Sequence, residues 1–137
     1  MSTHAKATFE IRAWDEKTWE GQPYNEVSGA KLTRASVAKS IQGDIAGEST
    51  LEYLMSYHEN GTVSFVGLER VVGSVGDRKG SFVLQRIGAD EGGVLKETYF
   101  VVPNSGTGDL RGLRGKGSAT LGEQAERYPF TLDYDLK

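Results

Sequence analysis

The fold is most clearly indicated by the stretch SGTGDLRGLRGKG, residues 105–117. It holds five glycines in thirteen residues, and inside a helix each glycine would cost about 1 kcal/mol relative to alanine. Glycine instead suits tight turns and strands pressed against another backbone. The spacing Gly106-x-Gly108 superficially resembles a phosphate loop, but the full glycine–lysine–serine/threonine spacing that leads into a helix is missing. The stretch therefore predicts a turn followed by a bent strand, from about Thr107 to Ala119.

Period-two alternation of apolar and polar residues extends this prediction along the chain. It is clearest in residues 49–57, where Leu51, Tyr53, Met55 and Tyr57 share one face, which we take as the inner one. We expect strands at about 5–14, 30–41 and 49–57, a pair around a turn near Asp77-Arg78, and further strands at 94–102, 107–119 and 127–136. Short strands with hairpin links predict an all-β fold, an eight-stranded antiparallel up-and-down barrel, as a single domain over residues 1–137.

Composition excludes several functional classes. The net charge of −3 gives no reason to expect a nucleic-acid partner. The chain has no cysteine, and its two histidines, His4 and His58, are far from any ligand-like cluster, so we expect no metal and no cofactor. No segment is apolar enough for a membrane span or a signal peptide, which predicts a cytoplasmic protein without a membrane partner.

Two turns set the predicted strand register. Asn60-Gly61 is typical of a two-residue type I′ hairpin, which would place Leu51 opposite Arg70 and Tyr53 opposite Leu68. The turn near Asp77-Arg78 would then place Arg70 opposite Gln85. A one-residue slip in either hairpin would exchange the two faces of the strand that follows.

With this register, the predicted ligand-binding residues lie inside the barrel. They are Tyr53, Tyr57, Arg70 and Gln85, among Leu51, Met55, Val66, Leu68, Val72 and Val83. Arginine, glutamine and tyrosine in an apolar surrounding could hold the carboxylate or carbonyl oxygen of a small ligand. Alternatively, Arg70 pairs with an internal carboxylate or extends to a barrel mouth.

The same register puts a charged row on the outer face, namely Glu52, Glu69 and Arg86. This row is either an exposed ion network or, if it faces inward, a pair of carboxylates in which one pKa is raised enough for acid catalysis. The outer face would also carry Phe65, Val71, Phe82 and Leu84. An apolar group of that size predicts a homo-oligomer contact on the outer barrel face.

Several motifs resemble a bacterial family of unknown function, DUF3224, over nearly the whole chain. They are Trp14, residues 43–47 (GDIAG), 66–70 (VGLER), 80–84 (GSFVL) and 102–110 (VPNSGTGDL). The resemblance implies an eight-stranded barrel of the allene oxide cyclase type. Ser105-Gly106-Thr107-Gly108 also resembles the Gly-Gly-Thr-Gly signature of allene oxide cyclases and plant dirigent proteins, with a serine in place of the first glycine.

Three functions remain open. The first is a small-ligand-binding barrel that holds an apolar molecule with one polar or anionic group. The second is a cofactor-independent cyclase or isomerase, in which Arg70, Tyr53 or Tyr57 stabilises developing oxygen charge. The third is a structural or interaction protein, for which we expect an interior without polar groups and a large apolar outer patch.

Overall fold

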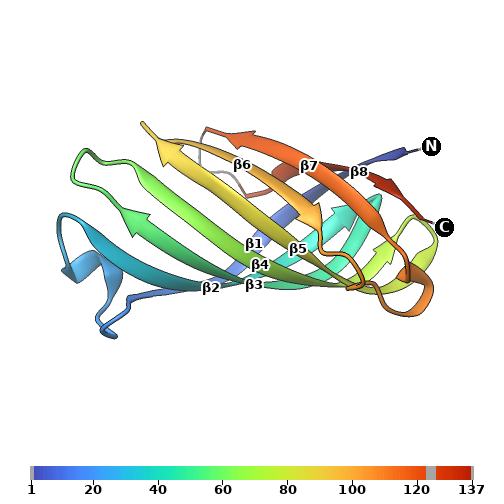
Figure 1. Cartoon of the computed structure of the whole chain (residues 1–137), viewed down its shortest axis with the longest axis horizontal. Helices are drawn as coiled ribbons and strands as arrows, with labels where there is room; N and C mark the ends of the chain where they lie inside the picture. Colours follow the sequence, from blue (N-terminus) through green and yellow to red (C-terminus); the bar gives the residue numbers. More distant parts are fainter. Residues whose placement is uncertain (1, 123–125, 137) are drawn as a thin grey trace.

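A computed structural model of the chain describes residues 2–122 and 126–136 (Figure 1). Among these residues, eight antiparallel strands pair in chain order and close into a barrel, which confirms the predicted all-β class. No helix in the described part is long and apolar enough to cross a membrane. The elements are β1 (Thr3–Thr18), η1 (Tyr24–Glu26), β2 (Lys31–Gly43), β3 (Ile45–Tyr57), β4 (Val63–Val75), β5 (Arg78–Glu91), β6 (Val94–Val101), η2 (Gly108–Leu110), β7 (Arg114–Leu121) and β8 (Tyr128–Asp135), where η marks a short 3-10 helix.

The two ends of the barrel differ. Both chain termini, η2 and the β4–β5 turn lie at one end, shown at the right of Figure 1. The connections β1–β2, β3–β4 and β5–β6 lie at the other end. We call the first end the closed end and the second the open end, for reasons that follow from their packing.

The glycine-rich stretch covers the closed end rather than forming one long strand. β7 begins only at Arg114, so the predicted strand from Thr107 is wrong in its first half. Residues before it fold through η2 and bury Leu110 completely against the core. The Thr107 hydroxyl accepts from the Ser81 amide at 3.0 Å, which ties the stretch to β5. A Cβ at Gly106 would lie 2.0 Å from the Leu110 carbonyl oxygen, so only glycine fits there.

The β3–β4 hairpin differs from its prediction by one residue. Its loop has three residues, 59–61, because the His58 amide donates to the Thr62 carbonyl and Gly61 takes a positive φ of 90°. This is the pattern of a three-residue hairpin rather than a two-residue type I′ turn. Leu51 consequently pairs with Glu69, not with Arg70. Every side chain of β4 therefore points to the face opposite to the predicted one.

The β4–β5 turn is also displaced, but without changing faces. It is formed by Gly76 and Asp77, with Val75 paired to Arg78, so Arg70 meets Val83 instead of Gln85. A shift of two residues keeps inner and outer positions the same. The reversed faces of β4 therefore carry over to β5. The residues predicted for the outer face, Phe65, Val71, Phe82 and Leu84, are buried in the interior.

A β-bulge at Arg12 reverses the faces of β1 halfway along. Ile11 pairs with Lys39 and Ala13 with Ala38, which leaves Arg12 as the additional residue. Before the bulge the inner positions are odd-numbered, as in buried Phe9; after it they are even-numbered, as in buried Glu16. The bulge brings Trp14 to the barrel mouth, where its ring lies 6.2 Å from that of Tyr53.

The interior divides into two apolar clusters. The larger, the closed-end core, fills the barrel toward η2 with Ala5, Ala7, Phe9, Ile41, Ile45, Val71, Val75, Phe82, Leu84, Tyr99, Val101, Leu110, Leu113, Phe130 and Leu132. The smaller, the open-end core, consists of Ala35, Val37, Leu51, Tyr53 and Phe65, with Met55 and Leu95 packed against it. On β2, β3, β4 and β6 the inward residue between the two clusters is polar, and these residues begin the candidate site.

Candidate functional site

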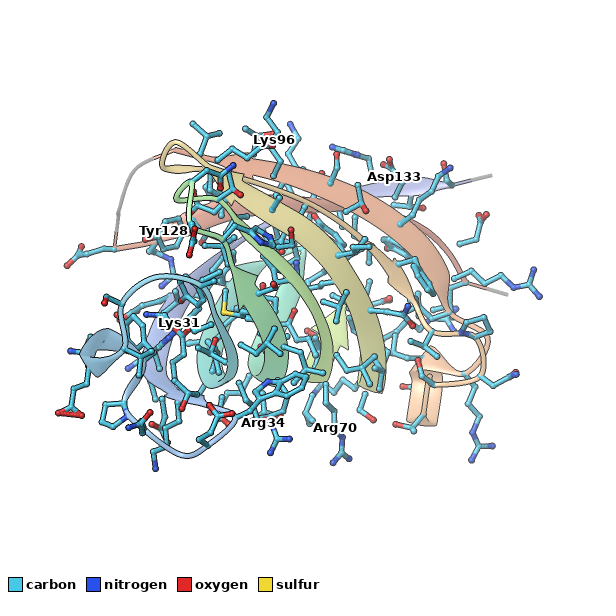
Figure 2. All side chains as sticks on the ribbon, turned by 60° about the vertical axis from the view of Figure 1, so that its left-hand side comes forward. Lys31, Arg34, Arg70, Lys96, Tyr128 and Asp133 are labelled. Carbon is cyan, nitrogen blue, oxygen red and sulfur yellow. The ribbon has the colours of Figure 1, made fainter. Side chains whose placement is uncertain are left out.

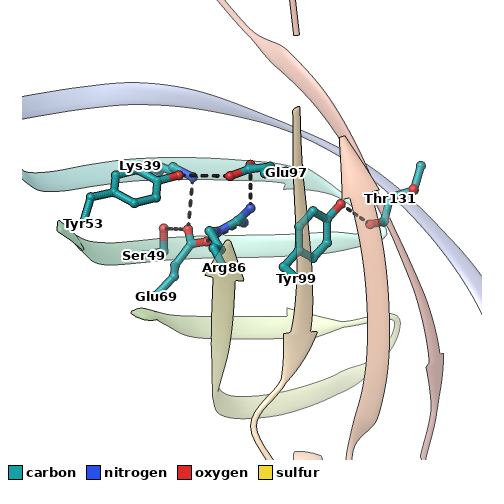
Figure 3. A network of polar contacts seen from close by, with 8 residues as sticks. All are labelled: Lys39, Ser49, Tyr53, Glu69, Arg86, Glu97, Tyr99 and Thr131. Atoms are coloured by element: carbon teal, nitrogen blue, oxygen red, sulfur yellow. Dashed lines mark hydrogen bonds and ion pairs between the residues drawn. The ribbon is translucent and has the colours of Figure 1, made fainter. Parts of the chain in front are cut away.

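A layer of buried polar side chains crosses the barrel between the two cores. Each strand from β2 to β6 contributes one inward residue to it, and all are less than a tenth exposed. Figure 3 shows them converging on the barrel axis. We call this set the polar layer: Lys39, Ser49, Glu69, Arg86 and Glu97.

Arg86 holds the two carboxylates of the layer. Its Nε donates to Glu69 Oε1 at 2.7 Å, its Nη2 lies 2.5 Å from the same oxygen, and its Nη1 donates to Glu97 Oε1 at 2.8 Å. The guanidinium also lies 4.5 Å from the ring centroid of Tyr99. Burial alone would lower the pKa of Arg86, but the charges of Glu69 and Glu97 outweigh it and raise that pKa above its ordinary value. Arg86 is therefore a permanent cation at the centre of the barrel.

Glu69 is ionised, and both of its carboxylate oxygens accept hydrogen bonds. Burial opposes its charge, but Lys39, Arg86 and a hydrogen bond from Ser49 outweigh burial and lower its pKa to about 2. The Ser49 hydroxyl donates to Glu69 Oε2 at 2.5 Å. With Arg86 on one oxygen and Ser49 on the other, Glu69 is a structural anion rather than a proton donor.

Lys39 is the most loosely paired member of the layer. Its Nζ lies 3.4 Å from Glu69 Oε2, the oxygen that already accepts from Ser49, and 4.2 Å from the centre of the Phe9 ring. Burial lowers the pKa of Lys39, and the attraction of Glu69 and Glu97 offsets this only in part. Lys39 thus keeps donor capacity that its neighbours do not use.

The polar layer forms the floor of a cavity that opens toward the open end. This cavity, the cup, has a volume of about 210 Å³. Its polar lining is Lys39, Glu97 and Tyr53, whose hydroxyl donates to Glu97 Oε2 at 3.2 Å. The remaining lining is mostly apolar: Phe9, Ile11, Trp14, Met55, Phe65, Gly93, Leu95, Leu121, Gly122 and Tyr128.

On the other side of the polar layer the barrel is packed. The hollow between Phe9, Ile41, Phe82 and Phe130 measures only about 10 Å³, which is at the lower limit for a single water. A ligand therefore has room on the open-end side of the layer and not on the closed-end side.

Tyr53 keeps its proton. Burial raises the pKa of its hydroxyl, and the charge of Glu97 raises it further. Its ring packs edge-on against Phe65, with the ring centres 5.0 Å apart. Tyr53 is therefore a rigid hydrogen-bond donor at the bottom of the cup, as predicted for an inward tyrosine.

Tyr57 faces inward as predicted but belongs to a separate cluster around Glu16. Glu16 accepts from Trp14 Nε1 at 3.0 Å, from the Thr33 hydroxyl at 2.7 Å and from the Tyr57 hydroxyl. Burial, followed by the hydrogen bond to Glu16, raises the pKa of Tyr57. Tyr57 does not line the cup, so its contribution is to fix Glu16 and, through it, the indole of Trp14.

Arg70 and Gln85 are exposed, and their predicted interior position is wrong. Arg70 points away from the barrel (Figure 2) and lines an outer depression with Arg12 and Glu48. The physical reason is the additional residue in the β3–β4 loop, because it exchanges the inner and outer faces of β4 and, through the pairing of the strands, of β5. Since Leu51 faces inward, its partner Glu69 does so too.

The predicted charged row is divided in the same way. Glu69 and Arg86 are inside, whereas Glu52 is exposed and accepts from the Ser36 hydroxyl at 2.9 Å. The alternative that Arg70 pairs with an internal carboxylate is wrong, because Arg70 is exposed; the arginine that pairs with internal carboxylates is Arg86. The interior without polar groups, expected for a purely structural protein, is contradicted.

The sequence reasoning missed Lys39, Glu97 and Trp14. A signal for the first two was present, because each occupies an inward position in an alternating strand: Lys39 between Val37 and Ile41, and Glu97 between Leu95 and Tyr99. A charge at such a position needs a buried partner. Trp14 had no comparable signal, since its direction depends on the bulge.

Neither histidine joins the site. His58 is exposed and lies 3.3 Å from the Ser64 hydroxyl, and His4 lies 2.5 Å from Asp133. Within residues 2–122 and 126–136, no group of three or more His, Cys, Asp or Glu side chains is placed to share a metal ion.

Comparison with known proteins identifies a family but no activity. Residues 5–134 match the family model described as "Protein of unknown function (DUF3224)". The chain is also similar to the crystal structure of a protein of unknown function from the DUF3224 family of Shewanella oneidensis MR-1. That similarity has a TM-score of 0.81 and 26% sequence identity and covers 100% of this chain and 99% of the other. No curated protein matches the sequence.

Proposed function

The chain belongs to the DUF3224 family, and we propose that it is a small-ligand-binding barrel whose cup takes an apolar molecule with one neutral carbonyl oxygen. The observation that supports this proposal is Lys39, a buried donor with unused capacity, at the bottom of an apolar cavity beside Tyr53. Ligand sites typically combine apolar walls with a few such convergent polar groups.

The size of the cup limits the ligand. Its volume of about 210 Å³ exceeds that of the roughly 150 Å³ apolar cavity known to accept benzene, so about ten non-hydrogen atoms fit. The walls offer aromatic and aliphatic surface from Phe65, Leu95 and Trp14. One or two rings, or a short branched chain, suit this space.

The charge of the polar layer favours a neutral ligand. Two carboxylates, Glu69 and Glu97, face two cations, Lys39 and Arg86, so the charges balance when Lys39 is protonated. A carboxylate entering the cup would add an uncompensated charge in a low-dielectric site. A carbonyl oxygen accepts from Lys39 without that penalty.

A cofactor-independent cyclase or isomerase is the second candidate. The hydrogen bond from Tyr53 to Glu97 favours it, because a donor and an acceptor then stand together beside the ligand space. Polarising a bound carbonyl through Lys39 would stabilise developing negative charge on its oxygen. Arg70, earlier considered for this role, lies on the outer face and is no longer part of it.

Calorimetric titration with coumarin, a neutral lactone, tests the binding proposal. We expect binding to the unmodified chain, strong loss of binding in Leu95→Trp, which fills the cup, and unchanged binding in Leu54→Trp, which alters the exposed face of β3. Lys39→Met removes the donor and should weaken binding by roughly tenfold. Equal affinity in Leu95→Trp and Leu54→Trp would exclude the cup as the site.

A further inference from the structure

We propose that Lys39 is a nucleophile, whose amine forms a covalent imine with the carbonyl carbon of an aldehyde bound in the cup. The inference rests on the proposed function, because it assigns aldehydes as a ligand class of the same cavity. It adds a chemical step that ligand binding alone does not require.

The position of Lys39 carries the argument. It lines the cup and is 5% exposed, so a bound carbonyl would meet its amine away from bulk water. Its single ion-pair partner among the described residues, Glu69, is 3.4 Å away and already hydrogen-bonded by Ser49 and Arg86. The face of the Phe9 ring covers another side of the ammonium group.

The carboxylates near Lys39 keep other hydrogen-bond and ion-pair partners when the ammonium group of Lys39 loses a proton. Arg86 retains both carboxylates, since it contacts Glu69 through Nε and Nη2 and Glu97 through Nη1. Tyr53 still donates to Glu97. Burial lowers the pKa of Lys39 and so increases the fraction of free amine near neutral pH.

The reaction balances without an added oxidant or reductant. The nitrogen lone pair of Lys39 forms a bond to the carbonyl carbon, and the C=O π electrons move to the oxygen, which takes one of the two amine protons through water at the cup mouth. The second amine proton reaches the carbinol oxygen by the same route, the C–O bond breaks, water leaves through the cup mouth, and the nitrogen lone pair forms C=N. Tyr53 keeps its proton and its hydrogen bond to Glu97 throughout.

Reductive trapping tests the proposal. The protein is incubated at neutral pH with equimolar benzaldehyde and sodium cyanoborohydride, and the modified lysine is located by peptide mass spectrometry. We expect one benzyl group per chain on Lys39, formed about tenfold faster than on exposed lysines. Lys116, exposed on β7, is the reference residue within the same molecule. Labelling of Lys39 no faster than Lys116 would overturn the inference.

Two controls separate this inference from the proposed function. Excess coumarin should slow the labelling of Lys39 and leave that of Lys116 unchanged, and this needs no variant. Lys39→Met should abolish the fast adduct while Lys116→Met keeps it, with folding checked by thermal unfolding. Coumarin binding without a Lys39 adduct refutes only the nucleophile. Absence of coumarin binding to the cup refutes the proposed function, whatever the labelling pattern.

Discussion

Arg86 and Glu69 form an ion pair inside the barrel, in which Nε of the arginine donates to Oε1 of the glutamate and Nη2 contacts the same oxygen. Both side chains are at most 3% exposed. Because the pair is shielded from water, removing either partner would leave the other charge buried and unpaired, which strongly destabilises the fold. The first two predictions follow from this dependence.

Removal of the guanidinium should destabilise the barrel strongly. In Arg86→Met, Glu69 and Glu97 lose their common partner, and breaking a buried pair in this way costs about 3–5 kcal/mol. Arg70→Met, on the outer face of β4, should change the free energy of unfolding by less than about 0.5 kcal/mol. Urea unfolding followed by circular dichroism measures both. Similar losses in the two variants would contradict the central role of Arg86.

Acid should remove the stability that Glu69 contributes. Its pKa is lowered from 4.5 to about 2 on folding, so its contribution is present above pH 4.5 and is lost as the pH falls toward 2. Glu69→Gln should therefore be less stable than the unmodified chain at pH 6, by up to about 3 kcal/mol. Their difference should shrink on acidification. The check is urea unfolding of both proteins from pH 6 to pH 2.5, and a pH-independent difference would rule the linkage out.

A methyl group at Gly106 should disrupt the closed end. In Gly106→Ala the Cβ would lie 2.0 Å from the Leu110 carbonyl oxygen, so the η2 segment must shift and Leu110 lose part of its burial. We expect a loss of about 1–3 kcal/mol. Gly122→Ala, whose Cβ would meet nothing within 4 Å, is the control. Thermal unfolding of the two variants is the measurement. A lower melting temperature only in Gly106→Ala would show that glycine is required at this position, and equal melting temperatures would contradict the prediction.

Ligand binding should be visible in the fluorescence of Trp14. The chain has two tryptophans, Trp14 in the cup lining and Trp19 outside it. In Trp19→Phe, Trp14 remains as the only indole. It is 43% exposed, so a ligand without an aromatic ring, such as cyclohexanone, should shift its emission to shorter wavelength by replacing water around it. The complementary variant Trp14→Phe, which keeps Trp19, should show no shift.

The outer face of β3, β4 and β5 should mediate self-association. Leu54, Val66 and Ile87 pair across these strands and are 42–59% exposed. A two-fold contact would bury such an apolar row against its copy. We expect a concentration-dependent dimer in sedimentation experiments, dissociated in Val66→Lys and retained in Val94→Lys, a similar change near the β5–β6 turn. A monomer at all concentrations would refute this expectation, which replaces the buried residues first predicted for the contact.

The strand pattern was predictable because alternation is a local property, whereas the assignment of faces was not. Leu51 and Tyr53 could be placed inside from β3 alone. The orientation of Glu69 depended on one residue in the turn around Asn60-Gly61, and both two-residue and three-residue loops accept that sequence. The two-residue turn therefore places Arg70 inside instead of Glu69, and puts Glu69 and Arg86, with Glu52, in an outer ion network.

The cup depended on a second local irregularity. Arg12 breaks the alternation of β1, and without the structure nothing distinguishes an additional residue there from a regular one. The sequence therefore identifies Trp14 only as part of a family motif and does not predict that it lines the cavity. The pairing of Lys39 with Glu69 joins strands that are not neighbours, and such contacts across a barrel follow from closure rather than from any single hairpin.

The separation of the interior by the polar layer has a consequence for how this scaffold changes over time. The closed-end core secures folding, while residues such as Leu95, Met55 and Leu121 line the cup without belonging to that packed set of buried residues. Substitutions among the cup residues can alter which molecule fits while the barrel still assembles. The residues that stabilise the barrel are therefore largely distinct from those that set the shape of its cavity.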